Sequence, residues 1–135
     1  MHLRNLQLNQ FKNHSQSTFT FTKQVNCFVG DNGAGKTNIL DAIHYLSHTK
    51  SYFNHIDAQN IQFDKEYFML KGSFEKQDST DEIQCNLKDG EGKVVKRNQK
   101  KYPVKADFKG ISLSTSINEH ISVVFSGKNT RVILE

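Results

Sequence analysis

The sequence predicts an α/β fold in which a small antiparallel β-unit leads into a strand, a glycine-rich loop and a helix. Two segments with alternating or aromatic-rich patterns open the chain, at residues 2–11 and 17–22. A short apolar run at residues 25–29 reads as a buried strand, and apolar residues recur at helical spacing from Ile39 to Leu46. Strand, glycine loop and helix in this order form the P-loop arrangement.

The glycine-rich loop matches the phosphate-binding P-loop (Walker A) pattern of a glycine, four free positions, and then glycine, lysine and serine or threonine. Its residues are Gly30, Asp31, Asn32, Gly33, Ala34, Gly35, Lys36 and Thr37. The four fixed positions would match by chance in roughly one chain of this length in two hundred. A glycine-rich helix cap is the alternative, but capping alone does not require the lysine and the threonine.

Each residue type in the loop has a chemical reason. Gly33 and Gly35 lack a Cβ, so they tolerate the positive backbone dihedrals that aim several N–H groups at a phosphate. A helix that begins near Lys36 adds unpaired N–H groups and the positive end of its dipole. We expect Lys36 to reach the β- and γ-phosphates and the Thr37 hydroxyl to bind Mg²⁺. Residues 30–38, which include Asn38, are the predicted nucleotide-binding set.

The first half of the chain resembles a known family on several stretches taken together. These are residues 9–13 at the end of the first strand, the phenylalanine-rich second segment, residues 26–43 around the loop, residues 44–53 after the helix, and the basic turn at 96–102. The stretches are similar to the RecF family, within the RecF/SMC group of ABC-type ATPase heads. The resemblance covers residues 1 to about 102 and implies the amino-terminal half of such a head.

The resemblance implies ligands and partners as well as a fold. ATP is expected rather than GTP, since no Asn-Lys-x-Asp stretch is present to read guanine. The family pattern places Lys12 near the phosphates, although a solvated turn lysine is the alternative. A RecF-like protein would dimerise around ATP on DNA and help load recombinase with RecO and RecR. An SMC head and a nucleotide-binding module without turnover are the other candidate functions.

The second half of the chain predicts an antiparallel β-lobe. Residues 67–74, 82–88 and 93–97 read as strands, with Ile83, Cys85 and Leu87 inward and a glycine turn at 89–92. A loop at residues 54–64 is expected to be anchored by its apolar residues, which are Ile56, Ile61 and Phe63. We divide the partial head into residues 1–50, 51–110 and 111–135.

The end of the sequence bears on activity. Residues 121–125 could form a core strand, but the chain shows neither four apolar residues followed by Asp-Glu nor a Leu-Ser-Gly-Gly stretch. These would supply the hydrolytic carboxylates and the loop that closes on a partner's nucleotide. We therefore expect this sequence to bind ATP without turnover.

Positive charge gathers on the predicted hairpin. Residues 88–109 hold eight basic and three acidic residues, a surplus larger than the net charge of +4 of the whole chain. A local surplus is typical of a phosphate-contacting surface, and a solvated hairpin is the alternative. The predicted DNA contacts are Lys93, Lys96, Arg97, Lys100 and Lys101.

Composition and isolated residues argue against other sites. The sequence has no run of about 18 apolar residues and no secretory leader. We therefore expect a cytoplasmic protein without a membrane partner. Cys27 and Cys85 read as free, buried thiols. His44 and His48 have a spacing that can bind zinc but lack a neighbouring glutamate. Asp41 could touch the Mg²⁺ shell, but an exposed or capping carboxylate is the expectation.

Overall fold

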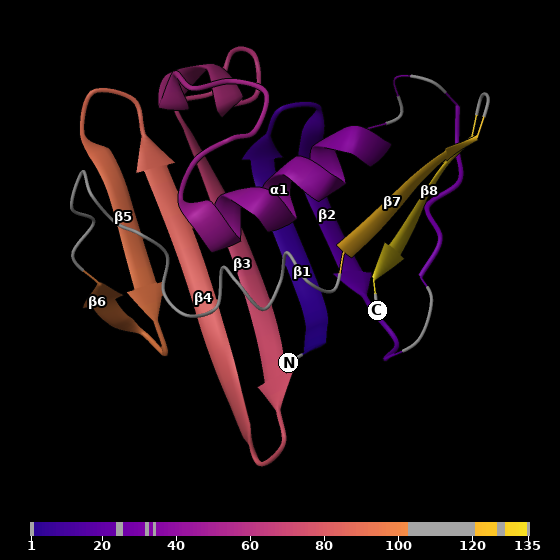
Figure 1. Cartoon of the computed structure of the whole chain (residues 1–135). Coiled ribbons are helices and arrows are strands. Elements are labelled where there is room, and N and C mark those ends of the chain that lie inside the picture. The colour runs from indigo at the N-terminus through magenta and orange to yellow at the C-terminus, as the bar shows by residue number, and fades with distance from the viewer. Residues whose placement is uncertain are drawn as a thin grey trace.

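A six-stranded antiparallel sheet with a helix lying across one face forms the body of the protein (Figure 1). The computed structural model describes residues 2–23, 26–31, 33, 35–102, 121–126 and 129–134. The sheet has the order β2-β1-β3-β4-β5-β6. Its strands are β1 (His2–Phe11), β2 (His14–Thr20), β3 (Tyr67–Lys76), β4 (Ser79–Lys88), β5 (Gly92–Arg97) and β6 (Lys100–Tyr102).

The other elements are two helices and a hairpin. Helix α1 (Lys36–His48) is the helix that lies across the sheet, and η1 (Asp57–Asn60) is a short 3₁₀ turn after it. Strands β7 (Ile121–Ser126) and β8 (Asn129–Leu134) pair antiparallel in a sheet of their own. The predicted strand at residues 121–125 is therefore present as β7.

The alternation of side chains in the sheet matches the sequence prediction. In β4, Ile83, Cys85 and Leu87 are buried, while the residues between them point to the opposite face. Ladder pairs connect β1 to both β2 and β3, so the opening strands and the later meander share one continuous sheet. The expected antiparallel lobe is confirmed, and one face of it carries the core.

Helix α1 covers the apolar face of the sheet with the residues that the 3.6-residue period predicts. Ile39, Ile43 and Leu46 are buried in the core cluster together with Ala42 and Tyr45. Leu46 packs directly over Gly72 of β3, where an added Cβ would lie 2.8 Å from Leu46 Cδ1. The absence of a side chain at residue 72 lets the helix approach the sheet closely.

The end of β1 changes phase, as the pattern at Phe11 predicts. Leu6, Leu8 and Phe11 are all buried, because the positive φ of 53° at Gln10 turns Phe11 to the face of the two leucines while the pairing with β2 stays in register. The backbone there is satisfied by the segment after η1: Gln62 N donates to Gln10 O at 2.8 Å, and Lys12 N donates to Asn60 O at 2.8 Å. Phe11 therefore reaches the core while the next residues turn toward α1.

The predicted strand before the glycine loop is wrong in its described part. Residues 26–30 lie in no strand, Cys27 is exposed, and Val29 is 72% exposed. An apolar run makes a strand only where a neighbour satisfies its backbone groups, and no described strand pairs with these residues. Phe28 instead packs against the rings of Phe19 and Phe21.

The loop after α1 also differs from its prediction. Ile56 and Phe63 are exposed rather than anchoring, with Phe63 94% exposed, whereas Ile61 packs partly against the core. The buried anchor is Asn60, whose amide donates to the backbone carbonyls of Asn54, Ile56 and Asp57. A polar side chain can anchor a turn because it satisfies backbone groups that an apolar one cannot.

No helix among the residues that the structure describes is both long and apolar enough to span a membrane.

The two cysteines are free, as predicted, but they differ in environment. Burial raises the pKa of the Cys85 thiol to about 12, whereas Cys27 is exposed. We predict that a disulfide reagent at pH 8 titrates one thiol rapidly in the native protein and two after denaturation, because the thiolate is the reactive form. The Cys27→Ser variant should lose the rapid phase, and two rapid thiols in the native protein would contradict this assignment.

Candidate nucleotide-binding site

Helix α1 begins without the groups that usually satisfy a helix amino terminus. Gly35 occupies the cap position with a φ of 99°, no side chain caps the helix, and the first turn holds no acidic residue. The first N–H groups of a helix have no partner within the helix, and they carry its positive dipole end. Thr37 lies exposed in this first turn. The helix end is thus suited to an anion.

Lys36 lies across the loop that leads into the helix. Its side chain is buried, and its ammonium donates a hydrogen bond to the carbonyl of Gly30. Gly33 has a φ of 85°, in the left-handed region, as the phosphate-loop interpretation requires. Asp31 is exposed, and Asn38 is half-buried in the first turn of α1. Asn32 and Ala34, which the sequence places in the same site, lie outside the described residues.

The β1–β2 turn, residues 12–14, packs against this loop. Asn13 Nδ2 donates to Gly33 O at 3.2 Å, and Asn13 Oδ1 accepts from Asn38 Nδ2 at 2.8 Å. His14 Nε2 lies 3.0 Å from Gly35 O. Sequence reasoning assigned no role to Asn13 or His14, because nothing in the local pattern shows that the turn reaches a loop some twenty residues later.

Lys12, which the family resemblance places near the phosphates, forms an ion pair with Asp41 of α1. Its ammonium is 5.6 Å from the ring centre of Phe11 and 5.4 Å from that of Phe53. Its side chain is 15% exposed. A contact between Lys12 and phosphate stays a prediction, and it requires the ammonium to leave this carboxylate.

Asp41 is buried, so the expectation of an exposed or capping carboxylate is wrong. Besides Lys12, it accepts hydrogen bonds from the Ser51 hydroxyl at 2.5 Å and from the backbone N–H of Tyr52 at 2.7 Å. These donors are the reason that a carboxylate can be buried here. The residue joins α1 to the β1–β2 turn and to the segment that follows the helix.

The two histidines of α1 stack on each other. Their ring centres are 4.1 Å apart with an angle of 13° between the planes, and His44 also meets the edge of Tyr52. Burial lowers the pKa of His44. Among the residues that the structure describes, no group of three or more His, Cys, Asp or Glu side chains is arranged for a metal ion.

The basic hairpin divides its charges between the two faces of the sheet. Lys93 points toward the helix side, where its ammonium lies 2.9 Å from Asp57 Oδ2 and 2.5 Å from Thr49 O. Arg97, on the same face of β5, lies 2.7 Å from Asp81 Oδ2. Of the predicted DNA contacts, these two cations therefore already have carboxylate partners, whereas Lys96 and Lys101 are cross-strand neighbours on the other face.

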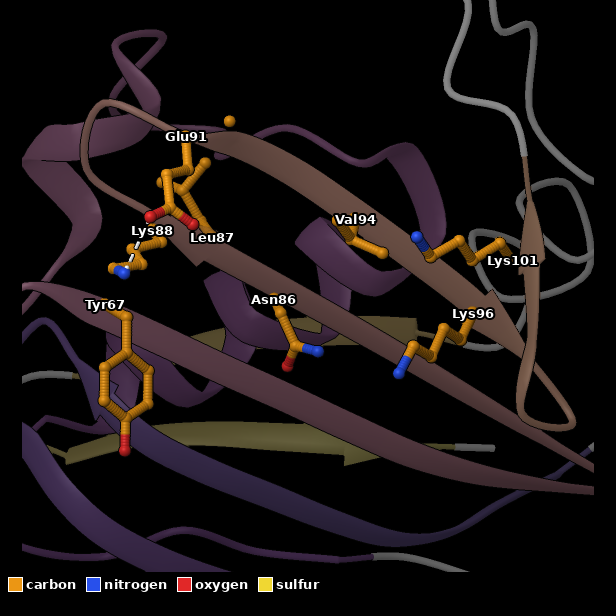
Figure 2. Close-up of a pocket in the computed structure, with 9 residues that line it drawn as sticks. Tyr67, Asn86, Leu87, Lys88, Glu91, Val94, Lys96 and Lys101 are labelled. Atoms are coloured by element: carbon orange, nitrogen blue, oxygen red, sulfur yellow. Dashed lines mark hydrogen bonds and ion pairs between the residues drawn. The ribbon is translucent and has the colours of Figure 1, made fainter.

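A shallow groove of about 410 Å³ lies on that other face, opposite α1 (Figure 2). Lys96 and Lys101 line one end, Tyr67 lines the other, and Asn86 and Val94 lie between them. Lys88 also lines the groove, but it pairs with Glu91 at 2.7 Å. Within the described part of the chain, no carboxylate lies within ion-pair distance of Lys96 or Lys101. Lys100 is exposed in β6.

The comparison with known proteins decides the family. A family model described as an AAA domain matches residues 5–133. The DNA replication and repair protein RecF of Flavobacterium johnsoniae is 49% identical over 110 residues, which are 82% of this chain and 31% of that protein. The chain belongs to the RecF family. It spans about a third of the length of the RecF relatives that it matches, and corresponds to the amino-terminal part of their ATPase head.

Solved structures agree with this RecF assignment. A structure of the recombination mediator protein RecF with ATP superposes with a TM-score of 0.73 at 27% identity, covering 93% of this chain and 32% of that one. An SMC ATPase superposes with a TM-score of 0.72 at 17% identity, covering 85% of this chain and 80% of the other. The SMC likeness shows the fold, and the predicted P-loop, ABC-type α/β class is confirmed.

We predict that Asp41→Asn destabilises this RecF-family head by about 3 kcal/mol, because it leaves the Lys12 ammonium without its charged partner in a largely buried place. Urea unfolding measures the change. Asp89→Asn, in the exposed β4–β5 turn, is the matched control and should unfold at the wild-type midpoint. Equal midpoints for the two variants would show that the Lys12 ion pair does not stabilise the fold.

Proposed function

We propose that this chain is the ATP-binding part of a RecF-like head, and that it binds Mg·ATP at the loop of residues 30–38. The observation that carries the proposal is the uncapped amino terminus of α1 with the Lys36 ammonium beside it. An uncapped helix end behind a glycine loop favours a phosphate group. ATP as the particular nucleotide is supported by the solved RecF relative, which contains it.

Each residue of the site has a proposed part in binding. The first N–H groups of α1 donate to phosphate oxygens, which are stronger acceptors than water. Lys36 exchanges the Gly30 carbonyl for β- and γ-phosphate oxygens, because a charged acceptor holds an ammonium more strongly than a neutral one. Mg²⁺ would be held by the Thr37 hydroxyl with phosphate oxygens, and it would neutralise part of their charge. Gly33 and Gly35 keep the backbone turned as the loop requires.

We predict that Lys36→Ala abolishes binding of Mg·ATP and leaves the fold intact, since the substitution removes a charge aimed at the loop. Isothermal titration calorimetry measures the affinity, and circular dichroism checks the fold. Lys65→Ala, at an exposed lysine before β3, is the matched control and should bind as the wild type does. Wild-type affinity in Lys36→Ala would sink the proposed nucleotide site.

We propose that the face of the sheet opposite α1 binds the DNA backbone. The support is the pair of lysines, Lys96 and Lys101, side by side on neighbouring strands with no carboxylate among the described residues at ion-pair distance. Lys100 pairs with Arg97 in the ladder, so it lies on the helix side and outside this surface. Lys93 and Arg97 are left out of this surface because Asp57 and Asp81 neutralise them on the helix side.

For the lysine pair, we predict that Lys96→Gln with Lys101→Gln weakens duplex binding and flattens its salt dependence. The log–log slope should become shallower by about 0.9 for each phosphate that the variant no longer neutralises. Fluorescence anisotropy over a salt series measures both quantities. The control replaces Lys23 and Lys50, two exposed lysines that do not line the groove, by Gln. An unchanged slope in the Lys96 and Lys101 variant would return this face to the role of a solvated surface.

The whole protein's partners follow the same proposal. We propose that RecO and RecR are its partners, because the solved relative is described as acting in the RecFOR pathway. An ATP-dependent homodimer and a cytoplasmic place complete this proposal. The SMC alternative is supported by likeness of fold alone, at 17% identity.

A further inference from the structure

The β1–β2 turn does more than connect two strands. We propose that Asn13 and His14 are positioning residues, which hold the backbone of the phosphate loop in the orientation that receives the nucleotide. This inference rests on the proposed ATP site. It adds a second layer to that site, made of residues that touch the loop.

Two hydrogen bonds hold the imidazole ring of His14. Nε2 lies 3.0 Å from Gly35 O and Nδ1 lies 2.9 Å from Ser17 Oγ. A carbonyl oxygen can only accept, so Nε2 carries the hydrogen and donates it to Gly35. In the neutral ring, Nδ1 then accepts from the Ser17 hydroxyl. Both ring nitrogens are used, so the imidazole has a fixed orientation and the bond to the loop is preset.

The bond from His14 also fixes the orientation of the peptide group between Gly35 and Lys36. In a trans peptide, the carbonyl of one residue and the N–H of the next point in opposite directions. Gly35 O accepts from His14 and also from Ile39 N at 3.1 Å, which is the first turn of α1. The N–H of Lys36 therefore points away from the helix, toward the side where phosphate is proposed. A rotation of this peptide would present a carbonyl to an anion.

Asn13 acts on the preceding part of the loop in the same way. Its Nδ2 donates to Gly33 O at 3.2 Å, and its Oδ1 accepts from Asn38 Nδ2 at 2.8 Å. One side chain thus ties the glycine turn to the first turn of the helix. The carbonyl of Gly33 is occupied by a donor, which disfavours a flip that would turn it toward an anion.

The β1–β2 turn packs so closely against the loop that residue 35 must be a glycine. A Cβ added at Gly35 would lie 2.5 Å from His14 Nε2 and 2.6 Å from Asn13 Oδ1. Both distances are shorter than real Cβ contacts, so Gly35 is needed for the approach of the turn as well as for its φ of 99°. The turn and the loop are therefore built as one packed unit.

The turn is itself held firmly enough to position something else. Lys12 N donates to Asn60 O at 2.8 Å, and the Lys12 ammonium pairs with the buried Asp41. His14 is buried, and its ring meets the edge of Phe19. These interactions anchor the residues on each side of Asn13.

The test compares donors with space-filling groups at residue 14. We expect His14→Leu, which keeps apolar packing against Phe19 but has no donor, to weaken Mg·ATP binding about tenfold, the size of one hydrogen bond to a preset backbone. His14→Gln restores an N–H donor and should recover most of the affinity. Gln16→Ala, at an exposed position of β2, is the matched control. Calorimetry gives the affinities, and amide hydrogen exchange of Ile39, whose N–H donates to Gly35 O, should quicken in His14→Leu.

Asn13→Ala provides a second variant, because Asn13 is exposed and its replacement is expected to leave the fold intact. It too should weaken binding several-fold and quicken exchange in the loop. Equal affinities for His14→Leu and His14→Gln, with Asn13→Ala binding as the wild type, would overturn the positioning role. If the wild type itself bound no Mg·ATP, the proposed function would fail instead, so the two failures are distinguishable.

Discussion

The burial of Phe11 at the end of β1 is the constraint on which the site depends. Its ring meets Tyr45 and Phe68 edge-on, with ring centres 6.2 and 5.1 Å away. To reach that place, the chain passes through the left-handed region at Gln10 and again at Lys12. Non-glycine residues rarely adopt such a conformation, so the aromatic packing must offset its cost.

That constraint places three consecutive side chains over α1 and its loop. Lys12 pairs with Asp41 in the second turn of the helix, and Asn13 and His14 contact the glycine loop. The backbone at the start of α1 is therefore held by residues of the β1–β2 turn as well as by the loop itself. Aromatic packing fixes the turn, and the turn fixes the backbone that would meet a phosphate.

Local patterns in the sequence were enough to predict most of the fold. Alternation gave the faces of β4, and helical spacing gave α1 with Ile39, Ile43 and Leu46 inward. The phase change at Phe11 was also visible in the sequence, because Leu6 and Leu8 are two residues apart whereas Phe11 follows Leu8 by three. The glycine loop was predicted because its chemistry requires particular residue types in consecutive positions.

Contacts between distant segments could not be predicted in this way. Asp41 reads as an ordinary helix-surface carboxylate, and its burial depends on Lys12, Ser51 and Tyr52, which come from two other segments. Lys93 was grouped with its basic neighbours because charge counting ignores which face a strand residue takes. Alternation would have separated Lys93 and Arg97 from Lys96 once Val95 was known to be buried.

The β1–β2 turn has a consequence for its own length. Phe11 and His14 are ladder partners at the two ends of the turn, and two residues separate them. An inserted residue that shifted the pairing by one would reverse the direction of every side chain after it in β2, and His14 would then point away from Gly35. An insertion keeps these contacts only where a bulge absorbs it and leaves Phe11 paired with His14. The spacing between Phe11 and His14 can be compared in related sequences. It distinguishes chains in which the turn can contact the glycine loop from chains that share only the loop.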